Sequence, residues 1–139
     1  MDTESSLRIA AELKNLSVIR RFVQETATAL GADPDAISDV ILAVDEAATN
    51  SIVHGYQGQP GIIEIEVRRI GDSLVVCLRD QATSFDPTIV PSPDLTLPLE
   101  QRPFGGMGIH LMRQFMDKVT HRVTSQGDNE LTMVKKDVL

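Results

Sequence analysis

The chain has 139 residues, 42% of them hydrophobic and 24% charged, with a formal net charge of −7. This length and composition are typical of one globular domain with a single core. The acidic balance argues against general nucleic-acid binding, which needs clustered Lys and Arg, and it permits a basic protein partner. The sequence has no apolar run long enough to span a membrane and no signal-peptide pattern, which predicts a cytoplasmic protein that does not associate with a membrane.

The first predicted elements are a strand and a helix. Apolar and polar residues alternate from residue 7 to residue 14, which predicts a strand with one wet face. A helix is expected from about residue 17 to residue 30, after a cap at Asn15 or Ser17 and before Gly31. Arg20 lies on an early turn of this helix, where a solvated position is the ordinary interpretation.

A second helix is predicted to begin at Asp33-Pro34 and to end at Gly55. Its main apolar face is formed by residues at helical spacing, Ile37, Ile41, Val44 and Ala48. Glu46 and Asn50 stack one turn apart, roughly opposite that face and among partly apolar neighbours, which predicts that they line a cleft. An Asn oxygen can bind Mg²⁺, and a carboxylate can accept a proton from an attacking hydroxyl or water. The alternative is a half-buried polar pair that caps local backbone groups.

The second half of the chain reads mainly as strands. Residues 62–70 and 74–78 alternate around a turn at residues 71–73, which predicts an antiparallel hairpin and an α+β fold. Residues 81–104 contain five prolines and no clear periodicity, so they are expected to form a functional lid or a disordered loop. Residues 119–125 and 131–134 are predicted to be the last two strands.

Two segments beside the long loop suggest ligand chemistry. Gly105-Gly106-Met107-Gly108 stands directly before a predicted helix, where glycines let the backbone approach an anion held by free N–H groups. The spacing matches neither the Walker loop nor the dinucleotide fingerprint, and a flexible connection is the alternative. Asp80 ends a strand, and its carboxylate can accept a hydrogen bond from an exocyclic amine such as that of adenine, although a turn-forming Asp is the alternative.

Taken together, these segments resemble the Bergerat-fold ATP-binding superfamily of gyrase, the heat-shock chaperone, histidine kinases and the mismatch-repair ATPase. Residues 45–50 look like its N box, residues 80–87 like its first glycine box, and residues 105–109 like its second. The runs Asn50 to Tyr56 and Phe85-Asp86-Pro87 are closer still to one branch, the anti-sigma-factor serine/threonine kinases of the RsbW type. The resemblance covers essentially the whole chain.

The resemblance implies a single domain over residues 1–139, with residues 81–104 as the lid. The implied fold is a two-layer sandwich in which a mixed, mostly antiparallel sheet packs on about three helices. The implied activity is ATP-dependent phosphorylation of a STAS-type anti-anti-sigma protein, together with sequestration of a sigma factor. A homodimer is also implied.

The resemblance also assigns roles to individual residues. Glu46 would be the general base for a substrate serine or threonine, and Asn50 would hold Mg²⁺ against the phosphates. Asp80 would bind the adenine amine, and His54 would face the nucleotide. Arg20 would contact partner proteins. The remaining ATP-binding positions implied by the two glycine boxes are Ala82, Ser84, Gly105, Gly106, Met107 and Gly108.

The first glycine box and the last hairpin depart from the superfamily pattern. Ala82 and Ser84 stand where the superfamily favours glycine, and an alanine that needs positive φ would cost about 1 kcal/mol. Asp128-Asn129 stands near the place of the usual Gly-Thr, which puts a threonine contact to adenine in doubt. The alternative function is therefore a nucleotide-gated module that binds a partner with little or no phosphotransfer. A histidine-kinase catalytic domain ranks last.

Overall fold

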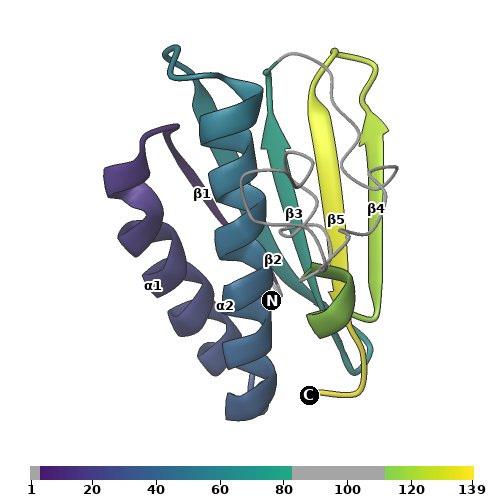
Figure 1. The fold of residues 1–139 in the computed structure, drawn as a ribbon. Helices are drawn as coiled ribbons and strands as arrows, with labels where there is room; N and C mark the ends of the chain where they lie inside the picture. Colours follow the sequence, from purple (N-terminus) through teal and green to yellow (C-terminus); the bar gives the residue numbers. More distant parts are fainter. Residues whose placement is uncertain (1–3, 83–111) are drawn as a thin grey trace, which may run out of the picture.

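The computed structural model describes residues 4–82 and 112–139, which form a sheet and a helical layer that covers one of its faces (Figure 1). Residues 112–115 are also helical. The other elements, in chain order, are β1 (Glu4–Ala10), η1 (Leu13–Asn15), α1 (Leu16–Ala29), α2 (Pro34–Thr49), η2 (Asn50–Gly55), β2 (Ile62–Ile70), β3 (Ser73–Asp80), β4 (Lys118–Val123) and β5 (Asn129–Lys135).

The five strands are ordered β1-β2-β3-β5-β4. All four pairings between these described strands are antiparallel. In the register of β3 with β5, Asp80 lies opposite Asn129. The predicted α+β sandwich is confirmed, and the sheet brings the end of β3 next to the start of β5.

The core lies between the sheet and the two long helices. Ile63 and Ile65 of β2 point into it, as do Leu74 and Val76 of β3, and all four are fully buried. The helices contribute Ile19, Val23, Val40, Val44 and Ala48. Cys77 is buried as expected, but strand alternation places it on the sheet face that α1 and α2 do not cover, where its Sγ lies 3.5 Å from Thr132 Oγ1.

The second helix begins where the sequence predicts. The Asp33 carboxylate accepts a hydrogen bond of 3.3 Å from the Ala36 backbone N–H, and Pro34 occupies the first helical position. At its other end the α-helical pattern stops at Thr49, and the six residues of η2 form a π-helical turn. Such turns are rare and occur frequently at functional sites. The residues of the N box therefore straddle a change in helical pitch, which the sequence pattern did not predict.

The first strand lies nearer the N-terminus than expected, because it runs from Glu4 to Ala10 and not from residue 7 to residue 14. The Asn15 side chain donates a hydrogen bond of 2.9 Å to the Ala10 carbonyl and makes no bond to the helix that follows. Asn15 therefore terminates the strand instead of capping α1 with its side chain. A short 3₁₀ turn, η1, takes up the residues between them.

The sheet face that the two long helices leave uncovered carries a charged network. The Arg79 guanidinium lies 3.2 Å from Glu64 and 3.4 Å from Glu66, and its Nε donates to Glu130 at 2.7 Å. Arg122 donates to the other oxygen of Glu130 at 2.6 Å. These bonds, that from Arg122 first and then that from Arg79, hold the pKa of Glu130 below its usual range, although burial opposes them.

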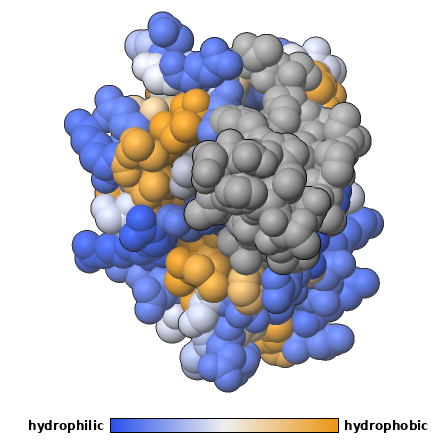
Figure 2. All heavy atoms as spheres, in the orientation of Figure 1, coloured by the Kyte–Doolittle hydropathy of each residue, from blue (hydrophilic) through white to orange (hydrophobic). Residues whose placement is uncertain are grey.

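Apolar side chains also reach the surface of the helical layer. Val18 on α1 and Leu42 on α2 are exposed, and Figure 2 shows apolar surface on the face of the molecule that carries these helices. Within residues 4–82 and 112–139, no helix combines the length and the apolar character needed to cross a membrane.

Candidate functional site

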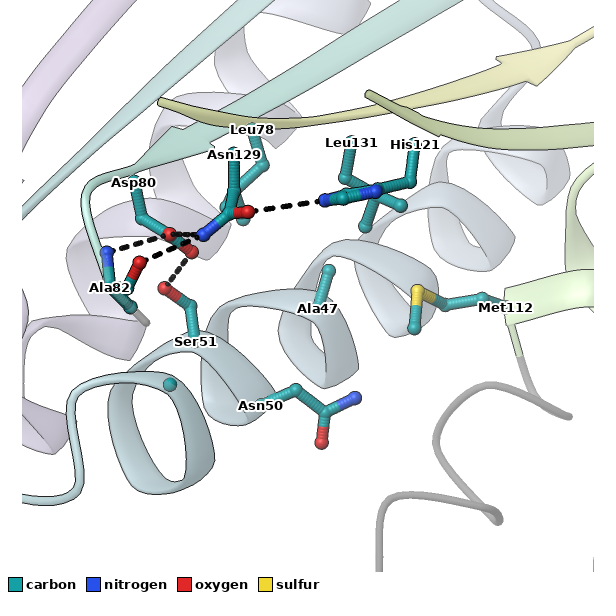
Figure 3. A pocket seen from close by; sticks show the side chains of 11 residues that line it. Ala47, Asn50, Ser51, Leu78, Asp80, Ala82, Met112, His121, Asn129 and Leu131 are labelled. Carbon is teal, nitrogen blue, oxygen red and sulfur yellow. Dashed lines mark hydrogen bonds between the residues drawn. The ribbon is translucent and has the colours of Figure 1, made fainter. Parts of the chain in front are cut away.

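A cavity that is partly open to solvent lies between α2–η2 and the ends of β3 and β5. Asn50 and Asp80, which the sequence assigned to opposite ends of a nucleotide, both line it (Figure 3). Most of the lining is apolar, with a few convergent polar groups, which is typical of small-molecule sites. The lining residues are Ala47, Asn50, Ser51, Gly55, Leu78, Asp80, Ala82, Met112, His121, Asn129 and Leu131.

Asp80 is buried and holds three hydrogen bonds. Ser51 Oγ donates to its Oδ2 at 2.5 Å, and the Ala82 backbone N–H donates to its Oδ1 at 3.1 Å. Asn129 Nδ2 donates to the same Oδ1 at 2.9 Å. Figure 3 shows these groups gathered at one end of the cavity, with the Asp80 carboxylate between Ser51 and Asn129. The network fixes the direction in which the carboxylate faces a ligand.

Asn129 and His121 extend this network across the strands. The Asn129 amide nitrogen also donates to the Ala82 carbonyl at 3.1 Å, and its oxygen lies 3.3 Å from His121 Nε2. Sequence reasoning noted Asn129 only as a departure from a family pattern and did not assign it a role. Its role depends on the register that places it opposite Asp80, and strand periodicity alone gives the face of a residue but not its partner.

Asn50 has a buried amide nitrogen that finds no hydrogen-bond partner among the described residues. A buried polar atom without a partner is costly, so its presence in a ligand cavity fits a site that a ligand completes. Among the same residues, no group of three or more His, Cys, Asp or Glu side chains could hold a metal ion. A Mg²⁺ ion here would therefore rely on the Asn50 oxygen, water and phosphate oxygens, which suits its coordination habits.

Glu46 lies one turn before Asn50 on α2 and is half-buried, but it does not line this cavity. Loss of hydration raises the pKa of Glu46, and the neighbouring negative charge of Asp45 raises it further. Asp45 in turn accepts a hydrogen bond of 2.7 Å from Arg20 Nε. Arg20, which was expected to contact partners, is thus linked to the residue beside Glu46.

The other predicted site residues divide into two groups. His54 is half-buried and does not line the cavity, and burial lowers its pKa. Ser84, the glycine-rich segment from Gly105 to Gly108 with Met107, and nearly all of the lid at 81–104 lie outside the described residues.

Ala82 sits in the cavity without backbone strain. Among the described residues, only Gln57 and Asp137 are non-glycine residues with positive φ. The cost of placing an alanine at positive φ therefore does not arise at Ala82. Its Cβ is directed at Gly55, where an added Cβ would come within 2.9 Å of it. The close approach of these two residues therefore requires a glycine at position 55, at the end of η2, and not at position 82.

Tyr56, which follows the π-helical turn, connects two segments near this contact through its hydroxyl group. Its hydroxyl donates to the Ile62 carbonyl at 2.7 Å and accepts from the Gln81 backbone N–H at 2.8 Å. Tyr56 thus ties the start of β2 to the residue after β3. The sequence marked the run that ends at Tyr56 as close to the RsbW branch but did not indicate this function.

Comparison with known proteins gives the class of the chain. The profile of the histidine kinase-like ATPase domain family matches residues 9–135, so the chain belongs to that family.

The relatives narrow the class further and confirm the predicted resemblance. The chain is 28% identical over 137 residues to the anti-sigma F factor of Clostridium kluyveri, an alignment that covers 99% of this chain and 95% of the relative. It is 30% identical over 117 residues to the serine-protein kinase RsbW of Bacillus cereus, covering 81% and 73% of the two chains.

A solved structure supports the fold alone. The crystal structure of the RsbU and RsbW domains of a Mycobacterium tuberculosis protein matches with a TM-score of 0.62 at 15% identity. The match covers 95% of this chain and 32% of that one, so this chain spans about a third of the length of the chain in that structure.

Proposed function

We propose that the chain is an ATP-dependent serine/threonine protein kinase and anti-sigma factor, which phosphorylates a STAS-type anti-anti-sigma protein and sequesters a sigma factor in the cytoplasm. One observation carries the proposal: a single cavity is lined by Asp80, whose carboxylate is fixed, and by Asn50, whose buried amide nitrogen has no partner among the described residues. The names of the relatives, anti-sigma F factor and serine-protein kinase RsbW, support the same activity.

The nucleotide would lie with its base at Asp80 and its phosphates toward Asn50. Asp80 would accept the adenine amine, and the Asn50 oxygen would hold Mg²⁺, which supplies charge neutralisation at the phosphates. The family resemblance assigns Gly105, Gly106 and Gly108 to the triphosphate.

In the transfer step, the substrate hydroxyl oxygen would form a bond to the γ-phosphorus while the bond from that phosphorus to the ADP oxygen breaks. The hydroxyl proton would pass to Glu46, whose raised pKa makes it a better base than an ordinary glutamate. Phosphoryl transfer depends mainly on positioning and charge neutralisation, so this small set of groups is sufficient.

Radiolabel transfer from ATP to a co-encoded STAS protein tests the activity. We expect labelling by the unmodified chain, none by Glu46→Gln, and full labelling by Glu25→Gln, a matched change of an exposed acid on α1. Undiminished labelling by Glu46→Gln would refute the base assignment.

Calorimetry tests the metal assignment. Asn50→Ala should lose most of the Mg-dependent part of ATP binding, whereas its binding in EDTA should match that of the unmodified chain. Equal Mg-ATP affinity in the two proteins would remove Asn50 from this role.

Partner binding would involve Arg20 and the net charge of −7, which suits a basic sigma-factor surface. Arg20→Ala should weaken capture of the partner, while Arg21→Ala, a change of an exposed arginine one residue away, serves as the control.

A homodimer is also part of the proposal, and sedimentation at several concentrations tests it.

A second candidate is a nucleotide-gated binding module with little or no phosphotransfer. The observation in its favour is that Glu46 does not line the cavity shared by Asn50 and Asp80. Nucleotide-dependent capture of a sigma factor, without labelling of any STAS protein, would select this candidate.

A further inference from the structure

The hydrogen-bond capacity of Asp80 is almost fully used before a ligand arrives. A carboxylate offers about four acceptor positions, two on each oxygen. Oδ1 accepts from Asn129 Nδ2 and from the Ala82 N–H, so both of its positions are filled. Oδ2 accepts from Ser51, so within residues 4–82 and 112–139 one position remains for a ligand.

The amide of Asn129 is also committed. Its two N–H groups go to Asp80 Oδ1 and to the Ala82 carbonyl, both of which can only accept hydrogen bonds. The amide oxygen therefore faces His121, whose Nε2 must donate across the 3.3 Å that separate them. Asp80 and the Ala82 carbonyl thus fix which end of the amide faces them, and His121 holds the amide in place by donating to its oxygen.

This arrangement distinguishes the two purine bases. Adenine presents one amine to a carboxylate, and one acceptor position suffices for it. Guanine presents adjacent N1–H and N2–H donors, which need one acceptor on each carboxylate oxygen. With Oδ1 filled by Asn129 and Ala82, a bound guanine would leave one of these donors unpaired in a buried site, at a cost in affinity.

We infer that Asn129 is a specificity-determining residue that makes the cavity selective for adenine over guanine by occupying Asp80 Oδ1, with His121 as its positioning residue. This inference rests on the proposed function, because it assumes that Asp80 reads the base of a nucleotide. It goes beyond that function by assigning the discrimination to a residue that differs from the family pattern.

Calorimetry with ADP and GDP in the presence of Mg²⁺ tests the inference without turnover. The unmodified chain should prefer ADP, and Asn129→Ala should narrow the ratio of GDP to ADP dissociation constants by about tenfold, chiefly through tighter GDP binding. His121→Ala should narrow it less, because it frees the amide without removing it. Thr132→Ala, a change on β5 but on the opposite sheet face, should leave the ratio unchanged.

Each outcome bears on one hypothesis. An unchanged ratio in Asn129→Ala, or equal weakening of both nucleotides, overturns the inference and assigns Asn129 a structural role only. Equal affinity of the unmodified chain for ADP and GDP also overturns it. Failure of the unmodified chain to bind either nucleotide instead overturns the proposed function. If Asn129→Ala does not fold, Asn129→Ser takes its place, since the serine side chain is too short to make hydrogen bonds to both Asp80 and Ala82.

Discussion

The contact between Gly55 and Ala82 gives a stability prediction whose size follows from the structure. A Cβ added at Gly55 would lie 2.9 Å from the Ala82 Cβ. Favourable carbon–carbon contacts lie at about 3.5–4.0 Å, so Gly55→Ala must displace either the π-helical turn or the segment after β3. Overpacking of this kind costs about 1–3 kcal/mol. The higher helix propensity of alanine, up to about 1 kcal/mol, offsets part of the loss.

A double-mutant cycle isolates the clash from these other effects. Ala82→Gly alone should cost about 0.5–1 kcal/mol, through the greater freedom of glycine in the unfolded chain. In Gly55→Ala/Ala82→Gly the clash is absent, so the double variant should be more stable than the sum of the single changes by about 1–3 kcal/mol. Urea unfolding followed by far-UV circular dichroism measures this, since the chain has no Trp and one Tyr.

The clash should also reach the ligand cavity. Ala82 donates to Asp80 and accepts from Asn129, so its displacement disturbs the groups that face the base. Gly55→Ala should weaken ADP binding, and the double variant should recover it. Additive free energies of unfolding, within about 0.3 kcal/mol, would show that the two residues do not press on one another and would refute this reasoning.

Two pH effects follow from the charged groups. The pKa of Glu130 is lowered in the folded chain, so its bonds with Arg122 and Arg79 stabilise the fold above the ordinary glutamate pKa of about 4.3, and this stability is lost as the pH falls through the lower, folded-state pKa. Glu130→Gln should be less stable at pH 7 and should lose less stability on acidification, which urea titrations at pH 7 and pH 3 measure; parallel losses in both proteins would contradict this. If Glu46 is the base, kcat/KM should fall on the acid side at a pH above the ordinary pKa of a glutamate. Asp45→Asn should shift this fall to lower pH, because it removes the neighbouring negative charge that raises the pKa of Glu46. A fall that stays at the same pH would exclude this coupling.

The fold was largely predictable because its elements carry strong local signals. The apolar spacing of Val44 and Ala48 and the Asp33 cap define α2, and both features depend only on residues near one another in sequence. The same holds for β2, where alternation separates buried Ile63 from half-buried Glu64. Element ends were less accurate, because individual side-chain hydrogen bonds, and not periodicity, decide them: the first strand ends at Ala10, whose carbonyl accepts from the Asn15 side chain.

The candidate site was predictable only in part. Asn50 and Asp80 follow from motif spacing, and the structure brings them to one cavity. Ser51 and Asn129 were not assigned, because each bonds to Asp80, which is far away in sequence, and His121 was not assigned, because it acts only through Asn129. Ser51 reaches Asp80 across 29 residues and Asn129 reaches it across 49, and no local periodicity encodes such a pairing.

The departures from the family pattern are better explained as a consistent set than as separate losses. Ala82 fits because Gly55 provides the space that its Cβ needs and because its φ is not positive. Asn129, in the hairpin that lacks the usual Gly-Thr, bonds both to Ala82 and to Asp80. Ala82 and Asn129 therefore meet at one carboxylate, and each donates to it. The Asp80 carboxylate is thus held by three donors and, among the described residues, keeps one acceptor position unfilled on Oδ2, as the proposed adenine contact requires.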